Sequence, residues 1–347
     1  MLTANQIKEI RVHLEKAQNP LFFFDNDNDG LCSFLLLQRY IDKGKGFPIK
    51  TSPELTEDYF RKINELKPDY LFILDQPEVS EGFFKRVREI NLPVVWIDHH
   101  NIDRKKIPKF VNYYNPVFNT EKSNEPVTAL CYQISNKKED RWIAIVGCIS
   151  DKFVPKYYLN FKKDFPDLSV SSEDAFEIYY NSQIGKIARI FCFALMDRTT
   201  NVINMLKFLR KVKSPYEVLE DNSQTHSMHK RFRELYSKYQ KLIDKAKKQA
   251  NTFEKIIFFK YSGDISMSAE ISNKLKYLFP EKIIAVAKIS GSRVGISIRG
   301  KNIREPVLKV LENFEGATGG GHEAAVGIQI SFNNLDRFQE ELIKALK

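Results

Sequence analysis

The stretch Pro-Val-Val-Trp-Ile-Asp-His-His, residues 93–100, is a short apolar run that ends in one carboxylate and two imidazoles. This pattern is typical of a buried strand that delivers Asp98, His99 and His100 at its carboxyl end. Open α/β sheets bind ligands at the carboxyl ends of their strands. Carboxylates and imidazoles side by side are also suitable ligands for a divalent metal ion. The stretch therefore predicts a parallel sheet with a polar site at one edge.

Three other apolar runs among the first 151 residues also end at aspartate. They are residues 21–24, which lead into Asp-Asn-Asp-Asn-Asp-Gly at 25–30, residues 70–74 before Asp75, and residues 142–149 before Ser150 and Asp151. A buried strand or helix has no use for a carboxylate at its end unless something pairs with it. If several ends meet at one rim, the repulsion among their acids requires bound cations.

Composition sets the broad class of the protein. The chain has 347 residues, of which 43% are hydrophobic and 28% charged, as in an ordinary globular protein of roughly two domains. No apolar run approaches the roughly 20 residues of a membrane helix. The N-terminal residues also lack a signal pattern, so we expect a cytoplasmic protein without membrane attachment. The net charge of +10 favours a polyanionic partner such as nucleic acid.

The order of strand-like and helical patterns predicts an α/β fold in three segments. Residues 1–155 alternate between the two patterns, which indicates a parallel sheet covered by helices. Residues 156–250 are helical and increasingly rich in lysine, and 231–248 predicts a long exposed connector helix. Residues 251–347 return to strand-like runs and predict a second, smaller α/β domain. Its strand-like runs are residues 256–259, 283–287 and 294–298.

The aspartates at 25–30 match the opening of an EF-hand calcium loop, which is one alternative. The acid required at loop position 12 would be Leu36, and the preceding segment has a strand pattern where an EF-hand needs a helix. A strand, an Asp loop and a helix fit the residues better.

Asp75 alone could be a turn residue or a helix N-cap. The interpretation of Asp75 as a site residue is strengthened because it follows an apolar run, as the acids of the other three segments do.

The C-terminal segment contains a glycine cluster, Gly-Ala-Thr-Gly-Gly-Gly-His at 316–322. Its backbone N–H groups carry no obstructing side chains, so we interpret it as a loop that cradles a phosphate or carboxylate. A flexible glycine turn with an incidental histidine is the alternative. Ser297 and Arg299 alternate along a predicted strand and so face one way. Arg299 is a candidate second ligand for phosphate.

In these motifs the chain resembles the DHH phosphoesterase superfamily, in the branch that carries a C-terminal DHHA1 domain. That branch includes RecJ-type single-strand exonucleases and nanoRNase-type enzymes that degrade very short oligonucleotides. The archaeal RecJ-like nucleases, including those associated with the replisome or a repair helicase, are the most similar in size. The matching residues are Asp25–Gly30, Asp75, Asp98-His99-His100, Asp151, Ser297-x-Arg299 and Gly319-Gly320-Gly321-His322.

The resemblance implies a site for two divalent ions, typically Mn²⁺, with Mg²⁺ as the alternative. Carried over by position, the ligands are Asp27 for the first ion, Asp29, His99 and Asp151 for the second, and Asp75 as the bridge. The implied supporting residues are Asp98 to orient the histidines, His100 to contact the phosphate, and Arg299, Gly319, Gly320, Gly321 and His322 to bind substrate. One position departs from the pattern, because Phe23 stands where many relatives have a histidine ligand. Asp25 is then the residue that could substitute.

These roles predict a two-metal phosphodiesterase that cuts single-stranded DNA or RNA from an end, in DNA repair or replication. A nanoRNase or cyclic-dinucleotide phosphodiesterase is the first alternative, and a non-catalytic replisome scaffold is the second. An inorganic pyrophosphatase, from a related branch, is the third. The expected partners are single-stranded nucleic acid and a repair helicase or replisome component.

Overall fold

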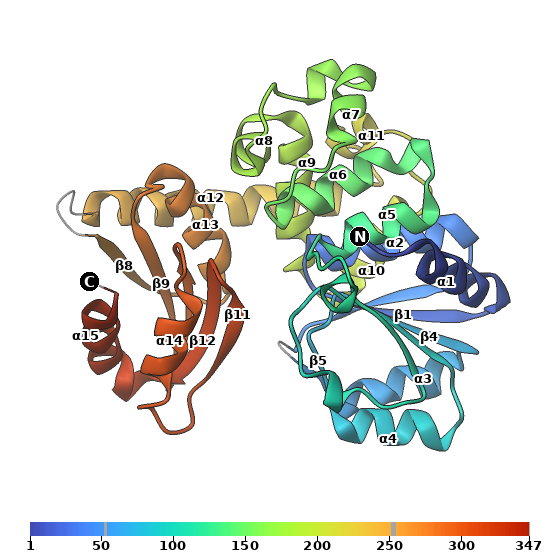
Figure 1. Cartoon of the computed structure of the whole chain (residues 1–347). Coiled ribbons are helices and arrows are strands. Elements are labelled where there is room, and N and C mark those ends of the chain that lie inside the picture. The colour runs from blue at the N-terminus through green and yellow to red at the C-terminus, as the bar shows by residue number, and fades with distance from the viewer. Residues whose placement is uncertain (52–53, 251–254, 347) are drawn as a thin grey trace. The chain divides into compact units, whose positions relative to one another are not determined.

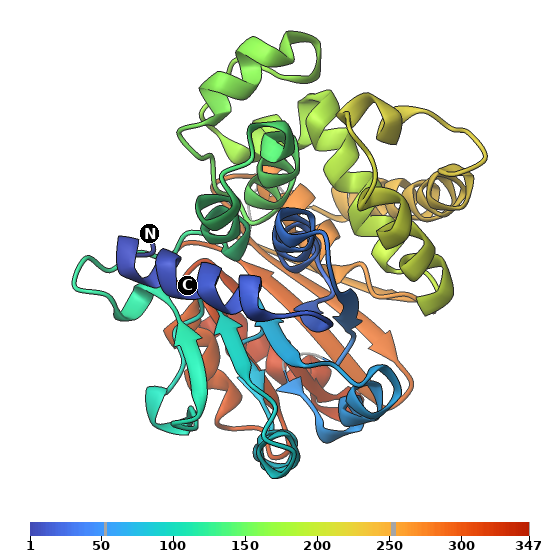
Figure 2. The same cartoon turned by 90° about the vertical axis from the view of Figure 1, so that its right-hand side faces the viewer.

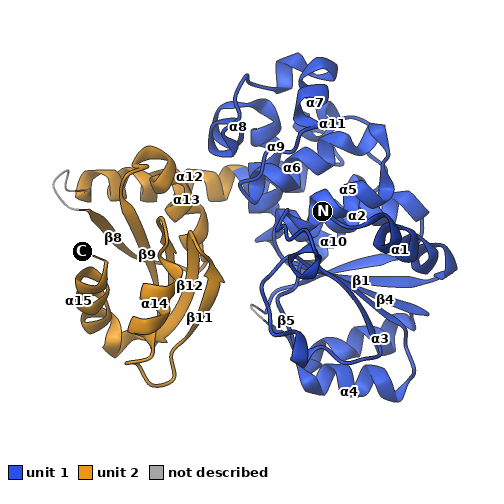
Figure 3. Cartoon of the chain, viewed as in Figure 1, with its two compact units in different colours: residues 1–232 blue, residues 233–347 orange. Residues whose placement is uncertain are grey.

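A computed structural model describes residues 1–51, 54–250 and 255–346. The chain forms two compact units, residues 1–232 and 233–347 (Figure 3). The helices between residues 156 and 232 belong to the first unit together with the sheet before them. The three-segment division expected from the sequence is finer than this and stays a prediction.

The first unit is built on a parallel sheet of five strands in the order β2-β1-β4-β6-β7 (Figure 1). The strands are β1 (Pro20–Asp25), β2 (Lys45–Ile49), β4 (Tyr70–Leu74), β6 (Val94–Ile97) and β7 (Val111–Tyr114). Because all five run the same way, their carboxyl ends share one edge. A separate pair, β3 (Glu54–Leu55) and β5 (Glu78–Val79), forms a small second sheet.

Helices cover both faces of the large sheet (Figures 1 and 2). One face is covered by α1 (Ala4–Lys16), α2 (Asn28–Ile41) and α5 (Val127–Ser135), and the other by α3 (Phe60–Leu66) and α4 (Glu81–Glu89). Alternate residues of β1 supply the two cores. Phe22 and Phe24 pack on the first face, while Phe23 packs on the second. This explains why the strand is a continuous apolar run and not an alternating one.

A layer of further helices extends the first core. They are α6 (Arg141–Ser150), α7 (Tyr158–Asp164), α8 (Ala175–Asn181), α9 (Gln183–Leu195), α10 (Thr199–Leu209) and α11 (Pro215–Leu219). Short 3-10 turns are η1 (Glu57–Tyr59), η2 (Arg104–Lys106), η3 (Pro116–Phe118), η4 (Lys138–Asp140) and η5 (Pro166–Leu168). Arg39 of α2 ties this layer to the sheet. Its guanidinium contacts the Asp140 carboxylate at 2.7 Å and the Val212 carbonyl at 2.7 Å.

The long helix α12 (His226–Gln249) confirms the helix expected at residues 231–248, but one face of it is buried. Leu235, Tyr239 and Ile243 follow one another at four-residue spacing, and each is at most 3% exposed. The lysines lie at the other positions of the helix, where they remain in solvent. The helix is therefore amphipathic, with one buried apolar face and a solvated lysine face.

The second unit contains a mixed sheet in the order β11-β12-β10-β9-β8, in which β8 and β9 are parallel and the other pairs antiparallel. The strands are β8 (Ile256–Ser262), β9 (Ile283–Ser290), β10 (Arg293–Arg299), β11 (Thr318–His322) and β12 (Ala325–Ser331). The helices are α13 (Ser268–Leu278), α14 (Arg304–Leu311) and α15 (Leu335–Ala345), with the turn η6 (Phe332–Asn334). Helices α14 and α15 cover one face of the sheet.

One expectation for this unit is corrected. The glycine cluster is not a loop, because residues 318–322 form the edge strand β11, paired with β12. Three glycines in a row favour a turn when judged locally, but pairing with a complete neighbouring strand supplies the hydrogen bonds that hold them extended.

No helix among the described residues has the length and apolar content needed to cross a membrane.

Candidate metal centre

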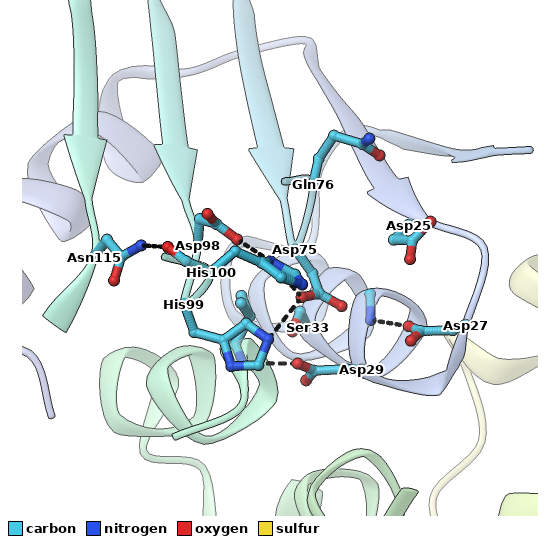
Figure 4. Close-up of polar contacts among 12 residues, drawn as sticks. Asp25, Asp27, Asp29, Ser33, Asp75, Gln76, Asp98, His99, His100 and Asn115 are labelled. Carbon is cyan, nitrogen blue, oxygen red and sulfur yellow. Dashed lines mark hydrogen bonds and ion pairs between the residues drawn. The ribbon is translucent and has the colours of Figure 1, made fainter. Parts of the chain in front are cut away.

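The structure brings together the aspartates and histidines that the sequence placed at the ends of apolar runs, at the carboxyl edge of the sheet (Figure 4). Asp25 is the last residue of β1, Asp75 follows β4, and Asp98 opens the triplet that follows β6. Asp151 differs, because the apolar run before it is helix α6, whose C-cap it forms. Three strands and one helix therefore deliver the acids that the sequence placed at four apolar ends.

The start of α2 places Asp27 and Asp29, directly after Asp25 at the end of β1. Asp27 is the N-cap of this helix and accepts a hydrogen bond from the Gly30 N–H at 2.9 Å. A Cβ atom at Gly30 would lie 2.4 Å from the Asp25 carbonyl oxygen. Only glycine lets the helix begin this close to the end of the strand. The glycine is therefore a packing requirement of the aspartate loop.

Asp29 is held by helix α5, which the sequence did not indicate. Its carboxylate accepts hydrogen bonds from the backbone N–H groups of Val127 at 2.8 Å and Thr128 at 2.6 Å. These are first-turn groups of α5, where orphan donors and the helix dipole favour a negative charge. The carboxylate is buried, so these donors fix its orientation within the site.

Three groups of three side chains among the described residues of the first unit have geometry suited to metal binding. In each group, one potential ligand atom from every member lies within 4.8 Å of the others. One group is Asp75, Asp98 and His100. The two that contain the expected ligands are Asp25, Asp27 and Asp75, and Asp29, His99 and Asp151. Asp75 connects them, because its Oδ1 atom lies 3.4 Å from Nε2 of His99 (Figure 4). The arrangement matches two adjacent ion positions with Asp75 between them.

The first group includes Asp25 and not residue 23. The Phe23 side chain is fully buried against the rings of Phe47, Tyr59 and Phe83, in the apolar core beneath α3 and α4. A ligand from position 23 would have to leave this apolar core. Asp25 lies two residues later, at the strand end, and already approaches Asp27 and Asp75. Asp25 is therefore the residue of this strand that can place a ligand atom beside Asp27 and Asp75.

Electrostatics favour cations in this cluster. Burial, and then repulsion from Asp27, raises the pKa of Asp25 to about 8. Burial and the neighbouring Asp151 raise the pKa of Asp29 to about 6. The pKa of Asp75 is raised well above its ordinary value by burial and by the carboxylates around it. Divalent cations would remove this repulsion, and a donor set of carboxylates with one imidazole fits Mn²⁺ or Mg²⁺.

Asp98 and His100 form a pair beside the two groups. His100 Nδ1 lies 2.7 Å from Asp98 Oδ1, and the other carboxylate oxygen accepts a hydrogen bond from the Tyr113 hydroxyl at 3.0 Å. Asp98 is fully buried, and both of its oxygens are engaged. This geometry suits the supporting role expected for it. Burial alone would lower the pKa of His100, but the charge of Asp98 and the other carboxylates raises it to about 9.

In the second unit, the predicted substrate residues lie along one face of the sheet. Register pairs His322 with Ala325 and Ala325 with Arg299, while Gly320 pairs with Gly327 and Gly327 with Ser297. Paired residues point to the same face. A Cβ atom at Gly320 or Gly327 would have no neighbour within 4 Å, so this face is bare backbone. The Arg299 Nε donates to Asn273 Oδ1 of helix α13 at 2.7 Å, which holds the guanidinium against that helix.

Comparison with known proteins identifies both the second domain and the fold. A family model described as the DHHA1 domain matches residues 254–347. RecJ from Thermus thermophilus, in complex with Mn²⁺, has a TM-score of 0.73 at 15% identity over 99% of this chain and 55% of that one. This chain therefore spans about half the length of that RecJ. No curated protein sequence matches the chain.

Two further structures cover most of both chains. An exonuclease RecJ bound to manganese has a TM-score of 0.68 at 15% identity, over 100% of this chain and 95% of that one. A DHH domain from a protein described as a member of a family of ribosomal proteins has a TM-score of 0.74 at 15% identity, over 99% and 90%.

The fold is that of RecJ, with a parallel-sheet domain, helices after it, and a smaller α/β domain. The family-model match shows a DHHA1 domain over residues 254–347, and the structures show that the chain as a whole shares the fold of RecJ. The resemblance and the fold class predicted from the sequence are thereby confirmed.

Proposed function

We propose that this protein is a metal-dependent phosphodiesterase that hydrolyses single-stranded DNA or RNA from an end. The observation that carries the proposal is the pair of three-residue groups joined through Asp75. Two adjacent ligand sets rich in carboxylates, with Asp75 of one set in contact with His99 of the other, are suited to a two-ion phosphodiester site. The fold shared with structures of RecJ bound to manganese supports the same ion.

The side chains of the first unit divide the chemistry among them. Divalent ions, when bound, would supply Lewis-acid polarisation of the phosphate and a reactive water. Asp27, Asp29 and Asp75 would hold them, with His99 and Asp151 completing the second position. Asp25 takes the place of the histidine that other members have. His100, with its raised pKa, is protonated at neutral pH and would donate to a phosphate oxygen as negative charge develops.

The second unit would supply recognition of the nucleic acid. Arg299 and His322 offer cationic or hydrogen-bonding groups on either side of Ala325, in the row next to the one that holds Ser297, Gly327 and Gly320. A phosphate neighbouring the cut bond is a suitable ligand for them, because a guanidinium binds phosphate oxygens in pairs. A fixed phosphate site of this kind would set the distance from a strand end to the cut.

The net charge of +10 supports a substrate longer than a dinucleotide, since each basic contact releases counterions from a polyanion. The resemblance to RecJ-type exonucleases supports a role in DNA repair or replication, alongside a helicase or replisome component.

The test is a length series of single-stranded DNA and RNA oligonucleotides, labelled at either end, incubated with Mn²⁺ or with a chelator. We expect stepwise shortening with Mn²⁺ and none with the chelator. Asp75→Ala should abolish cleavage. Asp336→Ala, which removes a carboxylate that is 89% exposed in the second unit, should leave cleavage unchanged.

Three results would overturn the proposal in different ways. Cleavage confined to oligonucleotides of a few nucleotides would favour a nanoRNase. Phosphate release from pyrophosphate without cleavage of oligonucleotides would favour a pyrophosphatase. Activity that survives in Asp75→Ala would remove the two-ion site.

A further inference from the structure

We propose that Tyr113 and Asn115 are positioning residues for His100, acting through the buried carboxylate of Asp98. The inference rests on the proposed function, because the role of His100 at a phosphate is part of it. Neither Tyr113 nor Asn115 lies among the candidate metal ligands. Both belong to the end of β7, the strand that the apolar-run pattern did not reveal.

The four side chains form a continuous chain of hydrogen bonds. The Asn115 amide nitrogen donates to the Tyr113 hydroxyl oxygen at 2.8 Å. That hydroxyl donates to Asp98 Oδ2 at 3.0 Å, and Asp98 Oδ1 lies 2.7 Å from His100 Nδ1. The Asn115 amide also donates to the His100 carbonyl oxygen at 2.8 Å, so it holds the backbone of the histidine as well as its ring.

Each polar atom of this chain has a defined role. The Asn115 side chain uses both amide hydrogens, and its oxygen accepts from the Val117 N–H at 2.9 Å. The Tyr113 hydroxyl accepts one bond and donates one. Asp98 is 0% exposed and Asn115 is 3% exposed, so water competes little for the bonds that these two side chains make. A network satisfied in this way fixes the orientation of its members.

The consequence for His100 is a fixed ring. The Asp98 carboxylate engages Nδ1 at 2.7 Å, which holds the ring with Nε2 pointing away from Asp98. The Tyr113 hydroxyl prevents the Asp98 carboxylate from rotating, because it holds the second oxygen. Loss of the hydroxyl would leave Asp98 free to turn and His100 free to follow. Outer partners of this kind change activity by about 10- to 100-fold when removed.

The same strand offers a matched control. The Tyr114 hydroxyl points to the other face of the sheet and donates to Glu9 Oε2 at 3.2 Å. The Tyr113 ring packs against Trp96 with centroids 4.8 Å apart, and phenylalanine would keep this packing. Tyr113→Phe and Tyr114→Phe therefore each remove one hydrogen-bonded hydroxyl from adjacent positions. They differ in whether the lost hydroxyl belongs to the His100 network.

The experiment compares the wild-type chain with Tyr113→Phe and Tyr114→Phe. It measures kcat and KM on a single-stranded oligonucleotide, Mn²⁺ binding from the electron paramagnetic resonance signal of the free ion, and ¹⁵N chemical shifts of the His100 ring. We expect Tyr113→Phe to lower kcat about 10- to 100-fold, with KM and Mn²⁺ affinity unchanged and the His100 shifts altered. Tyr114→Phe should match the wild type in every readout.

A second variant tests the first link. Asn115→Ser keeps an oxygen that can accept from the Val117 N–H but removes the amide donors. It should lower kcat in the same direction and move the same His100 signals.

Equal kcat values and equal His100 shifts for the two tyrosine variants would overturn the inference. So would a loss of Mn²⁺ affinity in Tyr113→Phe that accounts for its lower activity. A wild-type chain that cleaves no phosphodiester would instead defeat the proposed function. The His100 shifts would still decide whether the network positions the ring.

Discussion

The stability of the first unit should fall as the pH rises from 6 to 8 when no metal ion is present. Asp25 has its pKa raised to about 8 in the folded chain, whereas an unfolded aspartate has a pKa of about 4. The folded state therefore holds a proton that the unfolded state has already lost. The same holds for His100, whose pKa rises from 6.5 to about 9. For both groups, stability is present at low pH and is lost as the pH climbs through the folded pKa.

The magnitude follows from proton linkage. When the folded state binds one proton more than the unfolded state, the free energy of unfolding falls by about 1.4 kcal/mol for each unit of increase in pH. Asp25 titrates within the range, so it contributes a loss of about 2 kcal/mol between pH 6 and 8. His100 acts in the same direction, which brings the expected loss to about 2–4 kcal/mol. Mn²⁺ requires ionised carboxylates, so saturating Mn²⁺ should remove this loss, and its stabilising effect should grow with pH.

The assay is urea unfolding at pH 6, 7 and 8, with a chelator or with Mn²⁺, followed by tryptophan fluorescence. The two tryptophans, Trp96 and Trp142, both lie in the first unit, so the signal reports that unit alone. Asp25→Asn should flatten the pH dependence of the metal-free protein. A metal-free stability that is constant or increases from pH 6 to 8 would refute the reasoning about the buried acids.

Three further predictions concern single positions. Phe23→His should lower the free energy of unfolding by about 2–4 kcal/mol in urea without raising Mn²⁺ affinity, because the side chain faces an apolar core; tighter Mn²⁺ binding would contradict this. Gly30→Ala should cost about 1–3 kcal/mol and most of the nuclease activity, since its Cβ would lie 2.4 Å from the Asp25 carbonyl oxygen; a variant with wild-type unfolding and activity would show that the loop adapts. Arg299→Ala should raise KM for a single-stranded oligonucleotide about 10-fold, while Arg293→Ala at the exposed start of the same strand should not; a fall in kcat alone would argue against a binding role.

The strands that carry acids were predictable because they are buried on both faces. A central strand of a parallel sheet is apolar at every position, so residues 21–24, 70–74 and 94–97 are visible as runs that end at polar residues. The edge strands are not visible in this way. Strand β2 contains Gly46 and Pro48, which are unfavourable in a sheet interior and acceptable at an edge, and β7 mixes polar and apolar residues.

The supporting residues of the site could not be read from local patterns. Asp29 takes its donors from Val127 and Thr128, and Asp98 takes one from Tyr113. These partners form no recognisable sequence motif, because a backbone N–H or a single hydroxyl can be assigned to the site only once the fold places it beside the carboxylate. The loop predicted for the glycine cluster was wrong for a related reason. The extended conformation of these residues depends on their pairing with β12, which is not visible in the local sequence.

The hydrogen bonds that Asp29 accepts from helix α5 also constrain the stage of folding at which the site can form. They join residues 98 and 99 positions apart in the chain. The intervening segment contains β4, β6 and β7, so the bonds close only after these strands have found their places. Contacts of such long sequence separation are costly to make early. We therefore expect the candidate metal centre to be completed late in folding. A bound ion would then slow unfolding and have little effect on the rate of folding.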